Sequence, residues 1–148
     1  MSSQFHILLF LRFVAVVQNP TLHYSLPSGT ITYDELLVNS PTSPFDPNTG
    51  KFIAPQEGIY IFNFDGFVYG ECKHGFLHFY LNGEDIGHYI EQNTDSISSR
   101  GISGMRAMTL KSGDEIKLSN ENGGCIYGDD FHPFTFMGTY LGKTTLFN

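Results

Sequence analysis

Apolar and polar side chains alternate with a period of two along most of this chain, and this alternation constrains its fold more than any other feature. In segment 58–66 (GIYIFNFDG) the aromatics at alternate positions are Tyr60, Phe62 and Phe64. A strand there would direct the three rings to one face of a sheet, because successive strand side chains point to opposite faces. Segment 75–81 (GFLHFYL) alternates similarly and ends at Asn82-Gly83, a strong signal for a tight hairpin.

The same period predicts about nine or ten short strands with turn signals between them, which is typical of a sandwich or closed barrel. No stretch of about twelve residues has a helical period. The expected strands are 13–17, 31–38, 51–53, 58–66, 75–81, 86–90, 106–110, 115–118 and 134–141. In the last of them, one face carries Phe134, Phe136, Gly138 and Tyr140. The sequence therefore predicts an all-β fold.

Composition agrees with this class and excludes others. The 148 residues suffice for one domain with a sizeable core; 41% are hydrophobic, 15% are aromatic and 16% are charged. So much apolar surface argues against disorder, and the many aromatics and glycines suit strands and turns. The net charge of −7 argues against binding to nucleic acid. It leaves carboxylates available for a hard cation such as calcium.

The N-terminal segment 5–17 (FHILLFLRFVAVV) superficially resembles the apolar region of a secretory leader. It has no basic start, carries Arg12 in its middle and shows no clean small-residue cleavage site. It is also too short to span a bilayer, so no membrane span is expected. We interpret its second half as the first strand, with residues 1–12 as an N-terminal extension and 13–148 as one domain.

Two cysteines, Cys72 and Cys125, allow two interpretations. They are either small buried thiols, as in intracellular proteins, or one disulfide, which would place the protein outside the cell. No C-x-x-C motif is present, which argues against structural zinc and against a redox pair.

Segment 45–64 (FDPNTGKFIAPQEGIYIFNF) closely resembles the signature of the C1q domain, the globular head of complement C1q, adiponectin-like hormones, cerebellins and short-chain collagens. The family pattern is matched by Phe45, Asp46, Thr49, Gly50, Phe52, Pro55, Gly58, Tyr60 and Phe62. The similarity extends over about residues 13–141, and no Gly-X-Y collagen-like run precedes it in this sequence. The chain is thus identified as a stalkless, single-head member of the C1q/tumour necrosis factor superfamily.

This resemblance implies a ten-stranded jelly-roll sandwich that associates as a homotrimer through an aromatic-rich flank. The total of 14 Phe and 8 Tyr is more than one small core needs, which also favours an interface. In the family fold, the strand beginning near Phe76 runs antiparallel to the strand ending near Asn120. The resemblance therefore implies that Cys72 and Cys125 meet at one rim and form a disulfide.

No catalytic motif accompanies the fold. Among six histidines there is no H-x-H pair of the kind that holds metal in cupin jelly rolls, although His74 and His78 are four residues apart. Nothing resembles G-x-S-x-G, H-E-x-x-H or a phosphate-binding loop. We therefore predict that the protein is not an enzyme.

Calcium is the candidate cofactor, because some family members hold it at the trimer apex. Oxygen ligands for such a site occur as Glu91 and Asp95 in one region, the predicted metal site, and as Asp129 and Asp130 in another. Solvated acidic loops are the alternative interpretation of both pairs.

Stalkless C1q-domain proteins of invertebrates resemble secreted lectins that recognise microbial glycans. Loop 120–133 (NENGGCIYGDDFHP) contains a candidate carbohydrate-binding set: Tyr127, Asp129, Asp130 and His132. A Gly-rich turn without a ligand is the alternative. We predict a secreted, trimeric lectin of innate immunity whose partners are glycans of microbes or glycoproteins. The other hypotheses are a cytokine- or hormone-like signalling ligand with a protein receptor, and a structural interaction module.

Overall fold

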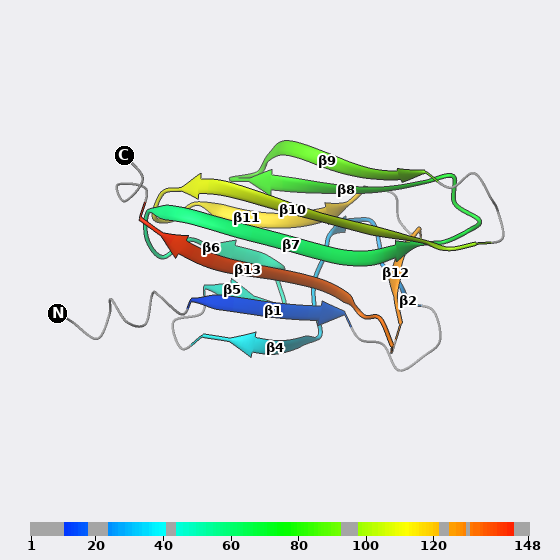
Figure 1. The fold of residues 1–148 in the computed structure, drawn as a ribbon, viewed down its shortest axis with the longest axis horizontal. Helices are drawn as coiled ribbons and strands as arrows, with labels where there is room; N and C mark the ends of the chain where they lie inside the picture. The colour runs from blue at the N-terminus through cyan, green and yellow to red at the C-terminus, as the bar shows by residue number, and fades with distance from the viewer. Residues whose placement is uncertain are drawn as a thin grey trace.

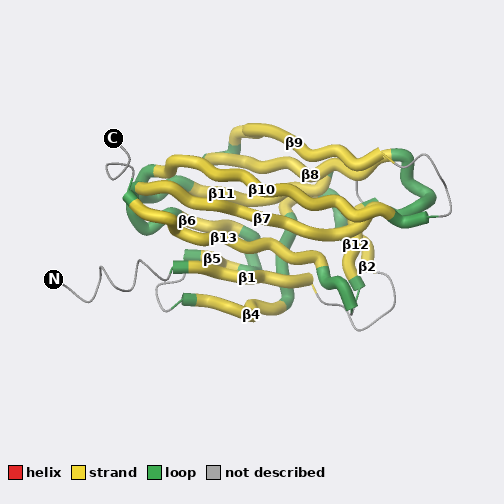
Figure 2. The backbone as a smooth tube through the Cα atoms, in the orientation of Figure 1, coloured by secondary structure: helices red, strands yellow, loops and turns green. Residues whose placement is uncertain are grey.

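The alternating segments form strands that assemble into two antiparallel sheets packed face to face (Figures 1 and 2). A computed structural model describes residues 11–17, 24–40, 44–92, 98–121, 125–129 and 131–143. The described residues form thirteen strands and no helix. The all-β prediction is therefore confirmed. Five of the thirteen strands are only two or three residues long, so there are more strand segments than the ten expected.

The first sheet is built around β7 (Gly58–Val68), which pairs with β10 (Arg100–Leu110) along one edge. On its other side, β7 pairs with β13 (Phe134–Gly142). Strand β13 then pairs with β1 (Arg12–Val17), and β1 pairs with β4 (Glu35–Asn39). The end of β7 also pairs with β12 (Ile126–Gly128), which in turn pairs with β2 (Tyr24–Ser25). The main order is therefore β4-β1-β13-β7-β10 (Figure 1).

The second sheet has the order β5-β6-β11-β8-β9. Its strands are β5 (Phe45–Asp46), β6 (Lys51–Ile53), β11 (Glu115–Asn120), β8 (His74–Leu81) and β9 (Glu84–Gln92). The short strand β3 (Gly29–Thr30) pairs with the far end of β11. Asn82 and Gly83 join β8 to β9 with φ angles of 52° and 82°, as the Asn-Gly hairpin signal predicts.

The inward side chains of both sheets form one hydrophobic core. Tyr60, Phe62 and Phe64 of β7 are at most 3% exposed, which confirms the face that the alternation predicts. From β1, Phe13 stacks on Phe45 of the opposite sheet with ring centroids 4.2 Å apart. The predicted inward face of β13 is buried as well.

The aromatic residues do not form an exposed flank in the described part of the chain. Twelve of them are buried, and among the strongly exposed large hydrophobic side chains only Phe131 is aromatic. The others are aliphatic or methionine: Leu37, Val38, Ile53, Ile90, Met105 and Leu141. Rings from both sheets therefore stack on one another and fill much of the interior, and a trimer contact through an aromatic-rich flank stays a prediction.

Segment 31–38 was expected to be one strand, but only its second half is, within β4. Ile31 and Tyr33 are buried, so the apolar alternation is real. The backbone, however, changes partners here: the amide of Ile31 donates to Leu118 in the second sheet, and that of Asp34 donates to Val16 in the first. The segment crosses from one sheet to the other, which prevents a continuous ladder.

None of the described elements is a helix with the length and apolar character needed to cross a bilayer.

Candidate functional site

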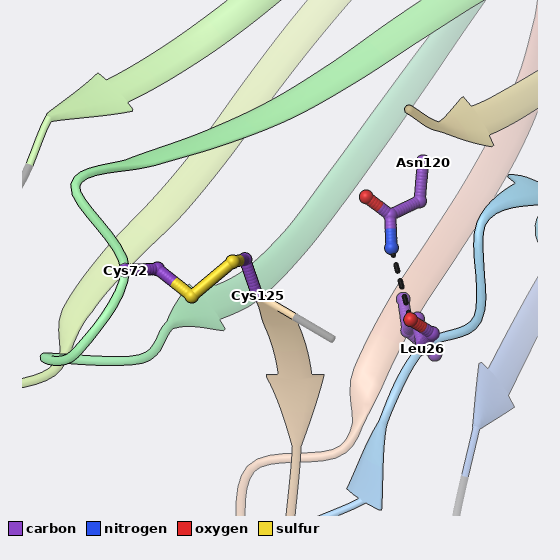
Figure 3. Close-up of a disulfide and its surroundings, with 4 residues drawn as sticks. All are labelled: Leu26, Cys72, Asn120 and Cys125. Atoms are coloured by element: carbon purple, nitrogen blue, oxygen red, sulfur yellow. Dashed lines mark hydrogen bonds between the residues drawn. A yellow bond between two sulfur atoms is a disulfide. The ribbon is translucent and has the colours of Figure 1, made fainter. Parts of the chain in front are cut away.

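A disulfide between Cys72 and Cys125 closes one rim of the sandwich (Figure 3). Strands β8 and β11 run antiparallel with Leu77 opposite Asn120, so the segment before β8 and the segment after β11 meet. This confirms the disulfide that the family resemblance implied. The bridge links positions 53 residues apart, and on the chain-entropy model it stabilises the fold by about 4 kcal/mol.

Backbone hydrogen bonds also hold the same rim together. The amide of Tyr69 donates to the carbonyl of Cys125 at 3.0 Å. Beside the disulfide, the fully buried Asn120 donates from Nδ2 to the carbonyl of Leu26 at 3.1 Å (Figure 3). The amide of Leu26 donates in turn to Ile126 at 2.7 Å. The segments after β2, β7 and β11 are therefore held as one unit, as a loop-borne site on a rigid scaffold requires.

The same rim carries an aromatic group that we call the rim cluster, consisting of Phe67, Tyr69, Tyr127 and His132. The rings of Tyr69 and Tyr127 stack with centroids 4.1 Å apart. Phe67 lies 5.5 Å from Tyr127 and also 5.5 Å, edge to face, from His132. Burial and the neighbouring phenol of Tyr127 raise the pKa of Tyr69 above its ordinary value, so Tyr69 stays a neutral phenol at physiological pH.

Asp129 organises the turn that carries His132. Its Oδ1 accepts hydrogen bonds from the amides of Phe131 at 2.9 Å and His132 at 2.6 Å. The imidazole Nδ1 of His132 lies 3.8 Å from the same oxygen. This is the ordinary role of an Asp side chain that caps a turn, and it leaves Oδ2 as the atom best placed to accept a ligand hydroxyl.

The predicted carbohydrate-binding residues thus have different environments. The His132 side chain is 68% exposed, and its neighbour Phe131 is 89% exposed. Tyr127 is buried, so it supports the cluster from within rather than offering an open platform. Asp130 lies outside the described residues.

Sequence reasoning missed Phe67, Tyr69 and Phe131 at this rim. Phe67 lies on the side of β7 away from the core, and Tyr69 comes directly after the end of that strand. That pattern identifies the face but not the partner, because the pairing of β7 with β12 joins positions about sixty residues apart in sequence.

The predicted metal site is only partly within the described chain. Glu91 lies near the end of β9, opposite Gly75 of β8, and Asp95 is outside the described residues. Across the described residues, no three His, Cys, Asp or Glu side chains are grouped so that they could hold a metal ion. Calcium binding stays a prediction.

Comparison with known proteins places this architecture in a family. The profile of the C1q domain matches residues 12–141. Complement C1q tumor necrosis factor-related protein 3 is 25% identical over 135 residues in Homo sapiens and 27% over 131 residues in Mus musculus. Each match covers 88% of this chain and 52% of the relative, so the chain spans about half the length of these curated relatives.

Solved structures agree at the level of the fold. The globular domain of zebrafish Complement 1qA protein superposes with a TM-score of 0.70 at 18% identity, covering 90% of this chain and 99% of that one. Eiger TNF from S. frugiperda gives a TM-score of 0.67 at 13% identity, covering 91% and 94%. Murine APRIL gives 0.65 at 11% identity, covering 88% and 98%. The predicted C1q/TNF-type jelly roll is confirmed, and the chain belongs to the C1q domain family.

Proposed function

We propose that this chain is a secreted, homotrimeric C1q-domain lectin that binds glycans through the rim cluster. The observation that carries the proposal is the exposure of His132 and Phe131 on a turn held by Asp129, beside the stacked rings of the rim cluster. Sugar sites combine an apolar surface for ring C–H groups with polar atoms for hydroxyls. Here Phe131 supplies the first, and His132 and Asp129 Oδ2 supply the second.

Binding rather than catalysis suits the family, whose members are generally non-enzymatic ligands and lectins. The disulfide supports secretion, because such bonds persist in oxidising compartments. Calcium remains part of the proposal at the predicted metal site, Glu91 with Asp95, because carboxylates suit a hard cation. Asp129 with Asp130 is the other acidic pair that the sequence offers for it.

The outward face of the first sheet supports trimerisation. C1q and TNF domains typically form trimers. On this face, Asn63 of β7 is paired with Met105 of β10 on one side and with Met137 of β13 on the other. These residues help to line a hollow of about 510 Å³, and Met105 is 60% exposed. Methionine is enriched at protein interfaces, and its flexible side chain adapts to a partner surface.

A glycan array tests the proposed function. The protein, first shown to be trimeric by light scattering, is applied in calcium and again in chelator. We expect competable binding that falls at least about ten-fold in His132→Ala and Phe131→Ala, because each removes an exposed contact. Ile53→Ala, which truncates another exposed apolar side chain in the second sheet, is the matched control and retains binding.

Comparing the array in calcium with the array in chelator tests the role of calcium. Loss of binding in chelator alone assigns a role to calcium, and equal binding in both arms excludes one. A blank array from an intact trimer contradicts the lectin proposal.

The second candidate is a trimeric signalling ligand that binds a protein receptor. The likeness of the fold to Eiger TNF and murine APRIL favours it, as does the similarity to proteins named tumor necrosis factor-related. Such a ligand would give a blank array and bind a cell-surface protein saturably, with loss of binding after receptor proteolysis.

A further inference from the structure

The outward face of the second sheet carries a group of aromatic and imidazole side chains unrelated to the rim cluster. On β8 and β9, His78 lies opposite His88, and Phe76 lies opposite Ile90. On the other side of β8, Ser119 of β11 lies opposite His78. The strand register therefore gathers these side chains on one surface, since paired residues share a face of the sheet.

Four residues of this face line an open pocket of about 560 Å³: Phe76, His78, His88 and Glu121. This volume lies within the range of about 300–1,000 Å³ that is usual for small-molecule sites. The centroids of the His78 and His88 imidazole rings are 5.3 Å apart. Ile90, beside Phe76, is 50% exposed and extends the apolar part of the surface.

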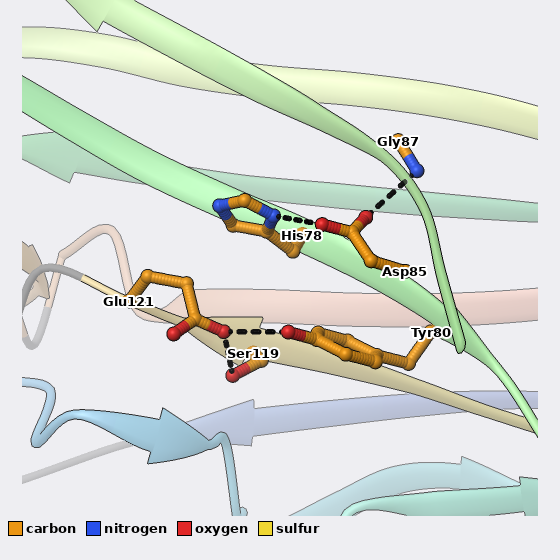
Figure 4. Close-up of polar contacts among 6 residues, drawn as sticks. All are labelled: His78, Tyr80, Asp85, Gly87, Ser119 and Glu121. Carbon is orange, nitrogen blue, oxygen red and sulfur yellow. Dashed lines mark hydrogen bonds and ion pairs between the residues drawn. The ribbon is translucent and has the colours of Figure 1, made fainter. Parts of the chain in front are cut away.

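The carboxylate of Glu121 is held in place at this pocket. Its Oε1 accepts hydrogen bonds from the Tyr80 hydroxyl at 2.8 Å and the Ser119 hydroxyl at 3.0 Å (Figure 4). The bond to Glu121 raises the pKa of Tyr80, which keeps the phenol protonated as a donor. In the described part of the chain no hydrogen bond reaches Oε2, which can therefore accept one from a ligand.

The imidazole of His78 is held in a similar way. Its Nδ1 lies 2.8 Å from Oδ2 of Asp85, whose Oδ1 accepts a bond from the Gly87 amide at 2.9 Å (Figure 4). The Gly87 amide, first, and the bond to His78 lower the pKa of Asp85, so this carboxylate is ionised. Asp85 then favours a proton on Nδ1, and Nε2 of a neutral ring is left as an acceptor on the side away from Asp85.

We propose that this pocket binds the ring of a neutral sugar, with ring C–H groups on Phe76 and Ile90 and hydroxyls on Glu121 Oε2 and the two imidazoles. The inference extends the proposed function by adding a second subsite for the same class of ligand on each protomer.

The combination of groups selects this ligand over the alternatives. A ligand anion would be repelled by Glu121 and Asp85. A ligand cation would find one carboxylate, Glu121, among the four lining residues, because Asp85 is bonded to His78. No three metal-binding side chains are grouped among the described residues, so a metal ion is not favoured. A sugar hydroxyl both donates and accepts, which suits a pocket that offers a carboxylate next to imidazoles.

Nuclear magnetic resonance of the trimer tests the inference, because the imidazole signals of His78, His88 and His132 report separately on the pocket and the rim. The probes are the free monosaccharides mannose, galactose, N-acetylglucosamine and fucose, titrated to millimolar concentration. We expect at least one of them to shift the His78 and His88 signals with saturation. In Glu121→Gln, which places an amide donor where the acceptor was, that affinity falls about ten-fold or more.

Three further variants make the result specific. His88→Ala truncates an exposed side chain of the pocket, so its effect does not depend on a change in folding. Glu57→Gln removes the same charge as Glu121→Gln from an exposed position between β6 and β7, and its affinity stays unchanged. His132→Ala leaves the pocket signals intact.

The outcomes separate this inference from the proposed function. If only the His132 signal responds to sugar, the pocket inference is wrong and the lectin function stands. If the pocket signals respond and the rim does not, the rim assignment is wrong and the pocket is supported. If no probe shifts any of these signals and the glycan array is blank as well, both proposals are wrong.

Discussion

At the scale of single residues, burial determines which polar groups matter for stability. Asn120 is fully buried, and its side-chain amide donates to the carbonyl of Leu26 at 3.1 Å. One buried amide therefore holds together two segments that are more than ninety positions apart in sequence.

We expect Asn120→Ala to lower the free energy of unfolding by about 1–3 kcal/mol, because it leaves a buried carbonyl without its donor. Urea denaturation of the purified protein measures this change. Asn39→Ala, on an exposed position of β4, is the matched control and should stay within about 0.5 kcal/mol of the parent. Equal effects of the two substitutions would contradict the role given to Asn120.

Tyr60 makes the free energy of unfolding depend on pH in the alkaline range. Burial raises its pKa to about 12, while the hydroxyl donates to the Gln56 carbonyl at 2.7 Å. Because the folded-state pKa lies above the unfolded value of about 10, the stabilisation is complete below pH 10 and is lost as pH rises toward 12. This group lowers the free energy of unfolding by at most about 1.4 kcal/mol per pH unit in that window.

Urea unfolding at a series of pH values from 9 to 12 provides the measurement. Tyr60→Phe removes this titration and should flatten the pH dependence. The slope that remains comes from other tyrosines with raised pKa values, such as Tyr33 and Tyr140. A variant whose curve keeps the full parental slope would show that Tyr60 does not contribute.

At the scale of elements, β13 is packed too closely against the core to accept a larger residue at its centre. A Cβ at Gly138 would collide with the ring of Phe13 and lie 3.0 Å from that of Phe62. Both rings are fully buried among other aromatics and cannot move away easily.

We therefore expect Gly138→Ala to destabilise the fold by about 1–3 kcal/mol, as overpacking of a core does. Gly101→Ala in β10 is the matched control, because the nearest atom to its Cβ would be the carbonyl oxygen of Gly66 at 4.0 Å. That variant should remain within about 0.5 kcal/mol of the parent. Thermal and urea unfolding measure the stability of both variants. If Gly138→Ala leaves the free energy of unfolding unchanged, the core can relax around the added methyl group.

Elements were largely predictable because their signal is local. The alternation in β7, β8 and β13 identifies both the strand and its buried face, since side chains on a strand have a period of two. Segment 31–38 shows the limit of this reasoning. Its buried residues alternate correctly, but its hydrogen-bond partners change from one sheet to the other, and no local pattern reports a partner.

At the scale of the whole molecule, the outward face of the first sheet is the proposed contact between protomers. We expect a particle of about 50 kDa in light scattering, three times the protomer mass of 16.6 kDa. Met105→Lys places one charge per protomer in that contact and should dissociate the trimer, because burying an unpaired charge is costly.

Ile53→Lys provides the control, since Ile53 is an exposed apolar residue of the second sheet. It should leave the mass at the trimer value. If Met105→Lys also remains trimeric, or if the parent protein is a monomer, the proposed contact is wrong.

The sequence by itself determined the all-β class, the inward faces of the strands, the Asn-Gly hairpin and, through the family signature, the jelly roll with its disulfide. Each depends on a short-range pattern or a family spacing. Only the tertiary structure decided that twelve of the aromatics are buried, that Tyr127 is buried against Tyr69, and that Glu121 reaches the face of His78. These contacts join segments that are distant in the chain, and their geometry follows from sheet register and crossing, which no local pattern encodes.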